Sequence, residues 1–365
     1  MSTTITPTDA NIVYSPGNWS VTSARAKTVN PGAYLRTLVA DADETITAIT
    51  LHLALTGTSN DTDPATLAVR IDGSDWQRLP VAATLTPTIP TYAAAWNRHL
   101  IEIVMDAHQS DKHGIWTCDD AVQITGIEVN TTGAITYPVQ ARPLRGLVFG
   151  DSIVAGVNTL GLGDGPGDSN ILDWSYLIGP MLDAEVGVVA WGGQGYGKQG
   201  TYAVPVLPDS MTSLWSPTAT DPGPTRDLTG YDFVLVAEGT NDGATDEATM
   251  LTNVAAVFDT LISQCDPTTV IAAVRPFNGS GIPTTVSNLQ AGIAACSEPA
   301  RVQWIDTTGW WDTSQAADGL HPYGYAHAAQ LAPHLAAQVA GLLAAAAGPT
   351  EGTRWVMTST GWVTV

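Results

Sequence analysis

Basic side chains are scarce in this sequence. The chain of 365 residues has 14 lysines and arginines against 35 aspartates and glutamates, which gives a formal net charge of −21 at pH 7. A surface this acidic repels the phosphate backbone of DNA and RNA. The composition therefore excludes nucleic acid as a partner.

Cysteine and long apolar runs are also lacking. The three cysteines, Cys118, Cys265 and Cys296, have no metal-ligand spacing and are too few for a disulfide framework. We expect buried free thiols, with a bridge between Cys265 and Cys296 as the alternative. No apolar run reaches the roughly 18 residues of a membrane-spanning helix, and residues 1–16 lack the basic start and apolar core of a secretory signal. These absences predict no metal site and no membrane partner, and they leave the cytoplasm as one expected location.

Residues 1–142 have the pattern of an all-β domain. Short stretches of alternating apolar and polar residues are separated by turn-forming clusters, and no helical period intervenes. These stretches lie at 45–55, 66–72, 98–106 and 121–130. We predict a β-sandwich of the jelly-roll kind over this part of the chain.

From residue 143 the pattern changes to strands that alternate with helices. Apolar strands are predicted at 145–150, 184–190, 231–239, 268–276 and 300–306. Helices are predicted at 172–183, 246–264, 284–297 and 322–346. The alternation predicts a three-layer α/β domain with a mostly parallel sheet over residues 143–347. The tail, 348–365, is predicted to form a strand pair that packs on one of the two domains or pairs with another copy of the chain in a homo-oligomer.

The first strand of the α/β part runs directly into Gly150, Asp151 and Ser152. In open α/β sheets, binding sites form beyond the carboxyl ends of the strands, where a following helix begins with free amides. A serine at this place is exposed and close to hydrogen-bond donors. The alternative is that Ser152 only caps a helix.

Two later segments carry polar groups of complementary chemistry. Asn241 and Asp242 follow the third strand, and a carboxamide there can donate to a developing oxyanion, although turn formation is the alternative. Asp318 lies three residues before His321, a spacing that lets the carboxylate accept the Nδ1 proton and leaves Nε2 free to take a serine proton. None of the other six histidines has an acidic residue three positions before it.

Ser152, Asn241, Asp318 and His321, in this order, resemble the SGNH (GDSL) hydrolase family, and the whole arrangement is similar to carbohydrate esterases with an N-terminal β-sandwich. The resemblance implies a flavodoxin-like three-layer α/β/α fold. It makes Ser152 the nucleophile, His321 the general base and then acid, and Asp318 the group that orients His321.

The resemblance also implies an oxyanion hole. Its donors are the amide of Ser152, the side chain of Asn241 and a glycine amide within residues 190–197. Ala190 and Gln194 depart here from the family's usual asparagine and small residue. Gly195 fits the glycine best and Gly193 is the alternative.

The implied reaction is hydrolysis of a short-chain ester, above all an acetyl ester on a carbohydrate, through an acyl-serine intermediate and without a cofactor. Trp191, Gly193 and Asp151 are the expected substrate contacts. The other aromatic candidates for sugar stacking are more often core residues. In the α/β half they are Trp174, Trp215, Trp310 and Trp311, and in the first half Trp19, Trp76, Trp96 and Trp116.

Three alternatives remain open at this point. The chain is a hydrolase of lipid or thioester acyl groups, a non-catalytic glycan-binding or virion structural module, or a deacetylase carried on a virus particle. The last hypothesis depends on the absent secretory signal and the threonine-rich, strand-forming tail.

Overall fold

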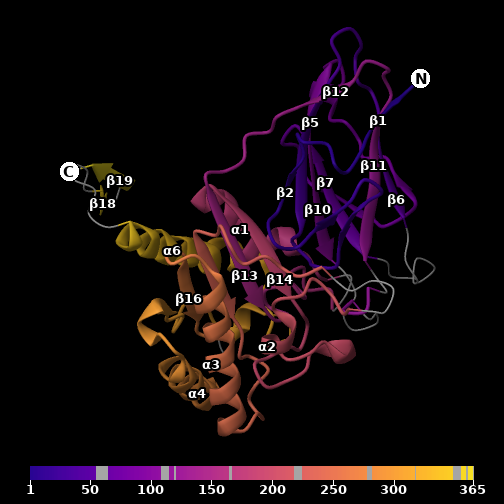
Figure 1. Cartoon of the computed structure of the whole chain (residues 1–365). Coiled ribbons are helices and arrows are strands. Elements are labelled where there is room, and N and C mark those ends of the chain that lie inside the picture. Colours follow the sequence, from indigo (N-terminus) through magenta and orange to yellow (C-terminus); the bar gives the residue numbers. More distant parts are fainter. Residues whose placement is uncertain are drawn as a thin grey trace.

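The computed structural model describes most of the chain as two parts (Figure 1). The described residues are 1–54, 65–107, 115–118, 121–163, 167–217, 224–277, 282–316, 318–347, 355–358 and 361–364. The first part is made of β-strands and the second of strands and helices. The hairpin of β18 and β19 lies beyond the end of α6.

Two antiparallel sheets form the first part, as predicted. One has the order β3-β4-β11-β6-β9, with β1 added on β11, and the other the order β12-β5-β10-β7-β8, with β2 added on β5. Alternate residues of β6, namely Ile49, Leu51 and Leu53, point into the core between the sheets. The strands are β1 (Thr3–Ile5), β2 (Val13–Tyr14), β3 (Ser20–Val21), β4 (Ala26–Thr28), β5 (Tyr34–Ala40), β6 (Ile49–Ala54), β7 (Thr66–Ile71), β8 (Gln77–Pro80), β9 (Thr84–Leu85), β10 (Arg98–Ala107), β11 (Val122–Val129) and β12 (Ile135–Tyr137).

A five-stranded parallel sheet forms the centre of the second part. Its order is β14-β13-β15-β16-β17, as in flavodoxin-like folds. β14 is added on one side of β13 and the later strands on the other, so the strand order reverses at the pair β13/β15. Every residue of β14 is buried, as expected for a strand covered on both faces. The strands are β13 (Leu144–Gly150), β14 (Ala184–Ala190), β15 (Phe233–Ala237), β16 (Val270–Val274) and β17 (Val302–Ile305).

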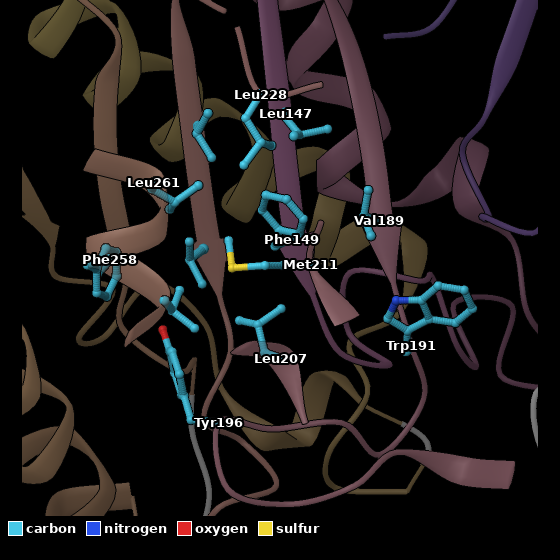
Figure 2. Close-up of a cluster of buried hydrophobic side chains, with 14 of the residues drawn as sticks. Leu147, Phe149, Val189, Trp191, Tyr196, Leu207, Met211, Leu228, Phe258 and Leu261 are labelled. Carbon is cyan, nitrogen blue, oxygen red and sulfur yellow. The ribbon is translucent and has the colours of Figure 1, made fainter. Parts of the chain in front are cut away.

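Helices cover both faces of this sheet. Side chains of α2, α3 and α4 share one core with Phe149 and Val236, which Figure 2 shows in part, and side chains of α1 and α6 share another with Val148 and Leu235. The predicted three-layer α/β/α architecture is therefore confirmed. The helices are α1 (Trp174–Leu182), α2 (Leu207–Ser210), α3 (Glu247–Gln264), α4 (Ile282–Ala295), α5 (Gly324–Ala326) and α6 (Ala332–Ala346).

Several details differ from or refine the sequence predictions. The short helix α2 was not predicted, and the predicted helix 322–346 is interrupted by a π-helical segment, His327–Leu331. Residues 324–346 have the length and composition of a membrane-crossing helix, but Leu335 and Val339 pack in the core of the α/β part. The tail forms an antiparallel pair, β18 (Trp355–Thr358) and β19 (Gly361–Thr364), and the three cysteines are free thiols.

The two parts share buried contacts. Trp116 and Ile115, from the first part, lie in the same hydrophobic cluster as Phe149 of β13. Asp106 on β10, fully buried, accepts hydrogen bonds from Ser169 Oγ (2.9 Å) and from the amide of Ile171 (2.9 Å). The β-sandwich therefore holds the 169–171 segment, which precedes α1.

Candidate active site

Ser152 lies directly beyond the carboxyl end of β13. Residues 151–160 form a series of turns, and the amides of Val154 and Ala155 both donate to the Asp151 carbonyl. The turn starts tightly at Gly150, where an added Cβ would lie 2.1 Å from Val154 Cγ2. The Ser152 side chain bonds to a histidine, so the capping alternative does not hold.

Three predicted residues come together across 169 positions of sequence. Ser152 Oγ lies 2.8 Å from His321 Nε2, and His321 Nδ1 lies 2.6 Å from Asp318 Oδ2. Both distances are those of direct hydrogen bonds. Ser152 is 9% exposed and the Asp318 side chain 36% exposed, so the group opens to solvent. This is the geometry of an activated serine.

The Asp318 carboxylate is held in the ionised, orienting state. Its Oδ1 accepts the amides of Leu320 (2.9 Å) and His321 (2.8 Å), which leaves Oδ2 for the imidazole. Partial burial raises the pKa of Asp318, but the hydrogen bonds from His321 and from these amides outweigh it and hold the pKa well below its usual range.

Asn158 is a further contact of this group that the sequence analysis missed. Its Nδ2 donates to Asp318 Oδ2 over 3.4 Å, and its own amide donates to Asp168 Oδ1 at 2.8 Å. Asn158 has a φ of 57°, in the left-handed region that asparagine tolerates better than most residues. An asparagine six positions after the serine gave no signal in the sequence, because its partner arrives only when the chain folds.

Two of the expected oxyanion donors stand beside the serine. Asn241 follows β15, the neighbour of β13, and its Nδ2 donates to the Gln194 carbonyl at 2.8 Å and to Asp151 Oδ2 over a longer 3.5 Å, which fixes the carboxamide. The contact with Asp151 is at the limit of a hydrogen bond, so the N–H that makes it can turn to a substrate oxygen at little cost. The Ser152 amide donates to no described residue.

The glycine donor is not the one that we expected. The Gly195 amide donates to the Lys198 carbonyl at 3.0 Å, so it has no free N–H in this conformation. Gly193 is half-buried, has a φ of 73°, and its amide donates to no described residue. Gly193 is therefore the remaining candidate for the third donor.

Two expected substrate contacts are wrong. Trp191 is fully buried, packs edge-on against Trp116 at 5.5 Å between ring centroids, and lies in the hydrophobic cluster of Figure 2. Asp151 is fully buried too, and it accepts the Ile153 amide at 2.9 Å. Both side chains are therefore enclosed in the protein interior, and burial raises the pKa of Asp151 to about 6. The core interpretation is correct for the buried tryptophans, which are Trp116, Trp174, Trp215 and Trp311.

A carboxylate beside a histidine is not in itself distinctive in this chain. His99 lies 2.6 Å from Asp72, His52 lies 2.7 Å from Glu128, and His327 lies 3.2 Å from Asp173. These partners are distant in sequence, so spacing alone could not reveal them. His321 differs because its second nitrogen bonds a serine.

A second buried carboxyl group lies at the end of β15. Glu238 is fully buried, and neither of its carboxyl oxygens has a hydrogen-bond partner. Burial and the charges of Asp151 and Asp242 raise its pKa well above the usual range, and the nearby amide of Gly239 only partly offsets this. A buried carboxyl group with a raised pKa therefore lies three positions before Asn241. Within the described ranges, no group of three or more histidine, cysteine, aspartate or glutamate side chains is arranged to hold a metal ion.

Solved structures of the same fold cover nearly the whole chain, whereas no protein-family model and no curated protein matches the sequence. A family two carbohydrate esterase from Cellvibrio japonicus superposes with a TM-score of 0.76 at 22% identity, over 94% of this chain and 98% of that one. The acetyl xylan esterase Est2A from Butyrivibrio proteoclasticus gives 0.73 at 15% identity, over 94% and 99%. A family two carbohydrate esterase from Clostridium thermocellum, solved with cellohexaose, gives 0.71 at 16% identity, over 91% and 99%.

These similarities extend over both parts of the chain. The fold is that of the two-domain carbohydrate esterases, a β-sandwich followed by an SGNH-type α/β/α layer structure. The fold implied by the sequence motifs is therefore confirmed.

Proposed function

We propose that this chain, which has the fold of the SGNH carbohydrate esterases, is a serine esterase that removes short acyl groups, above all acetyl, from carbohydrate. The observation that carries the proposal is the hydrogen-bonded line from Ser152 Oγ through His321 to Asp318, at 2.8 and 2.6 Å. A neutral serine is a weak nucleophile, and a correctly oriented imidazole removes that limitation.

Acylation starts with attack of Ser152 Oγ on the ester carbonyl carbon. His321 Nε2 takes the hydroxyl proton as the bond forms, and Asp318 stabilises the imidazolium through Nδ1. The carbonyl oxygen becomes an oxyanion, which accepts hydrogen bonds from the amide of Ser152, from Asn241 Nδ2 and from the amide of Gly193.

Collapse of the tetrahedral intermediate breaks the ester bond. His321 returns its proton to the departing sugar oxygen, which leaves as a hydroxyl group, and the acyl group remains on Ser152. Water then attacks the acyl-serine, again with His321 as base, and the second collapse releases the carboxylic acid and restores the serine. Atoms and charges balance without a metal or an organic cofactor.

Two observations support a carbohydrate ester as the substrate. Superposable structures include carbohydrate esterases and an acetyl xylan esterase. The triad is also open, since the Asp318 side chain is 36% exposed, and an open site suits an acyl group carried on a bulky polymer.

The test is hydrolysis of p-nitrophenyl esters of increasing acyl length, from acetate to dodecanoate, by the wild-type chain and by Ser152→Ala. We expect turnover of the acetate, a decline with acyl length, and loss of at least about a thousandfold in kcat on substitution. Ser74→Ala, in the partly exposed connection between β7 and β8 of the β-sandwich, is the matched control and should retain full activity.

The outcomes separate the candidate functions. Rates that rise with acyl length would favour a lipid or thioester acyl hydrolase. Turnover that survives Ser152→Ala would place the chemistry elsewhere, and a wild-type chain inactive on all esters would favour a binding module.

A further inference from the structure

A stacked pair of tyrosines, one exposed and one half-buried, follows His321 in the sequence. Tyr325 comes four positions after His321 and is 58% exposed, and its ring stacks on that of Tyr323, with centroids 5.6 Å apart and ring planes at 21°. The two rings therefore form a nearly flat double layer with Tyr325 on the outside.

The loop that follows Ser152 adds to the same surface. Gly161 packs against the Tyr323 ring, and an added Cβ there would lie 2.4 Å from Cε1. The next residue, Leu162, is 71% exposed. The Gly324 amide donates to the Thr159 carbonyl at 2.8 Å, so the two loops are joined by a backbone hydrogen bond. Leu162, Tyr323 and Tyr325, here called the tyrosine platform, thus belong to one surface.

Single exposed apolar side chains are ordinary, but a cluster of them marks a contact surface. Tyrosine presents a flat apolar ring with a polar tip, which suits ligands that have both apolar faces and hydroxyl edges. A pyranose ring has this character, because its C–H groups form a face and its hydroxyls form the rim.

The platform is within reach of the reacting atoms. Tyr325 comes four positions after His321, so their Cα atoms are at most about 14 Å apart. A sugar whose acyl group is at Ser152 can therefore have a neighbouring sugar of the same chain on Tyr325.

We propose that the tyrosine platform is a subsite that stacks a pyranose ring of a neutral polysaccharide next to the residue that carries the ester. This inference rests on the proposed esterase function and adds the class of acceptor to it. Neutral glycans are favoured because the net charge of −21 repels acidic ones.

The test compares Tyr325→Ala with Tyr325→Phe on two substrates. For acetylated xylan we expect Tyr325→Ala to raise KM about 5- to 10-fold, because a stacked ring loses its partner, and Tyr325→Phe to stay near wild type. For p-nitrophenyl acetate, which is too small to span both places, all three proteins should give the same kcat/KM. Tyr92→Ala removes a tyrosine of matched exposure, 57%, from the β-sandwich and should change neither substrate.

A binding measurement separates failure of the subsite from failure of the esterase. Calorimetry of deacetylated xylo-oligosaccharides with Ser152→Ala needs no turnover, and the Ser152→Ala/Tyr325→Ala double variant should bind about 5- to 10-fold more weakly. Equal affinities of these two proteins, absence of binding, or an equal loss on p-nitrophenyl acetate would overturn the proposal. Weaker binding in a chain without esterase activity would retain the subsite and reject the hydrolysis.

Discussion

At the scale of single residues, neighbouring groups hold each catalytic candidate so that one of its hydrogen-bonding atoms faces the reaction site. His321 has its Nδ1 occupied by Asp318, so Nε2 faces Ser152. Asn241 has one N–H on the Gln194 carbonyl at 2.8 Å and the other in a long, 3.5 Å contact with Asp151 that a substrate oxygen can replace. The chemistry therefore depends on contacts that the catalytic motifs themselves do not contain.

Replacement of Asn241 by alanine tests the oxyanion hole. We expect kcat on p-nitrophenyl acetate to fall about 10²- to 10³-fold with little change in KM, because the lost donor acts mainly on the oxyanion. Asn253→Ala is the control. Asn241 donates to the Gln194 carbonyl, and Asn253 donates to the Tyr196 carbonyl of the same loop at 2.8 Å, so both side chains anchor that loop. An equal loss in both variants would mean that loop anchoring, not oxyanion binding, explains the effect.

The raised pKa of Glu238 makes the free energy of unfolding depend on pH. Burial in the folded chain raises the pKa of the Glu238 carboxyl group well above the usual range, whereas an unfolded glutamate ionises above a pH of about 4.3. Stability linked to Glu238 is therefore complete below that pH and is lost as the pH rises towards the folded-state pKa, at about 1.4 kcal/mol per pH unit. Glu238→Gln removes this dependence.

Urea unfolding at pH 5 and pH 8 measures the effect. The stability of Glu238→Gln relative to wild type should increase between these two pH values. A variant that instead becomes relatively less stable at pH 8 would show that Glu238 is ionised and paired in the folded chain.

At the scale of elements, the parallel sheet could be predicted closely and its loops could not. Strand β14 has the predicted bounds, 184–190, because a strand buried on both faces is a continuous apolar run. The turns of 151–160 contain apolar residues such as Val154 and Val157 that also suit a helix, and their fold depends on bonds to Asp151 and Ser152. The burial of Trp191 could not be predicted for a related reason, because a tryptophan that follows the end of a strand has no local sequence signal that separates burial from exposure.

The candidate triad could be predicted from residue types at strand ends, whereas its supporting contacts could not. The parallel topology brings the carboxyl ends of β13 and β15 to one edge, which places Ser152 near Asn241. Asn158, Glu238 and the competing bond of Gly195 depend on packing between loops, which no periodicity encodes.

Replacement of Gly150 by alanine tests how tightly the turn after β13 is packed. In Gly150→Ala the new methyl group would lie 2.1 Å from Val154 Cγ2 and 3.1 Å from the Ala237 carbonyl, so the turn must shift. We expect a loss of about 1 to 3 kcal/mol in stability together with a fall in esterase activity. Gly341→Ala on α6, where an added Cβ meets nothing within 4 Å, should be neutral or stabilising in thermal unfolding. Unchanged activity and stability in Gly150→Ala would contradict the tight turn.

At the scale of the whole molecule, the β-sandwich shares buried contacts with the α/β part. Trp116 and Ile115 complete a hydrophobic cluster that includes Phe149, and Asp106 holds the segment before α1. A shared core of this kind couples the unfolding of the two parts.

Trp116→Ala tests that coupling. We expect a loss of about 3 to 5 kcal/mol, with helix content and tryptophan fluorescence changing in one common transition, because the cavity opens in a core that both parts share. Two separate transitions in the wild-type chain, or a loss confined to the first one, would mean that the sandwich folds as an independent unit.

The identity of the nucleophile is the central claim, and covalent labelling tests it most directly. The chain is treated with diethyl p-nitrophenyl phosphate, and the modified peptide is identified by mass spectrometry. We predict one equivalent of p-nitrophenolate, one diethylphosphoryl group on Ser152, complete loss of esterase activity, and no labelling of Ser152→Ala. A stoichiometric adduct on another residue, or full activity with Ser152 modified, would contradict the account.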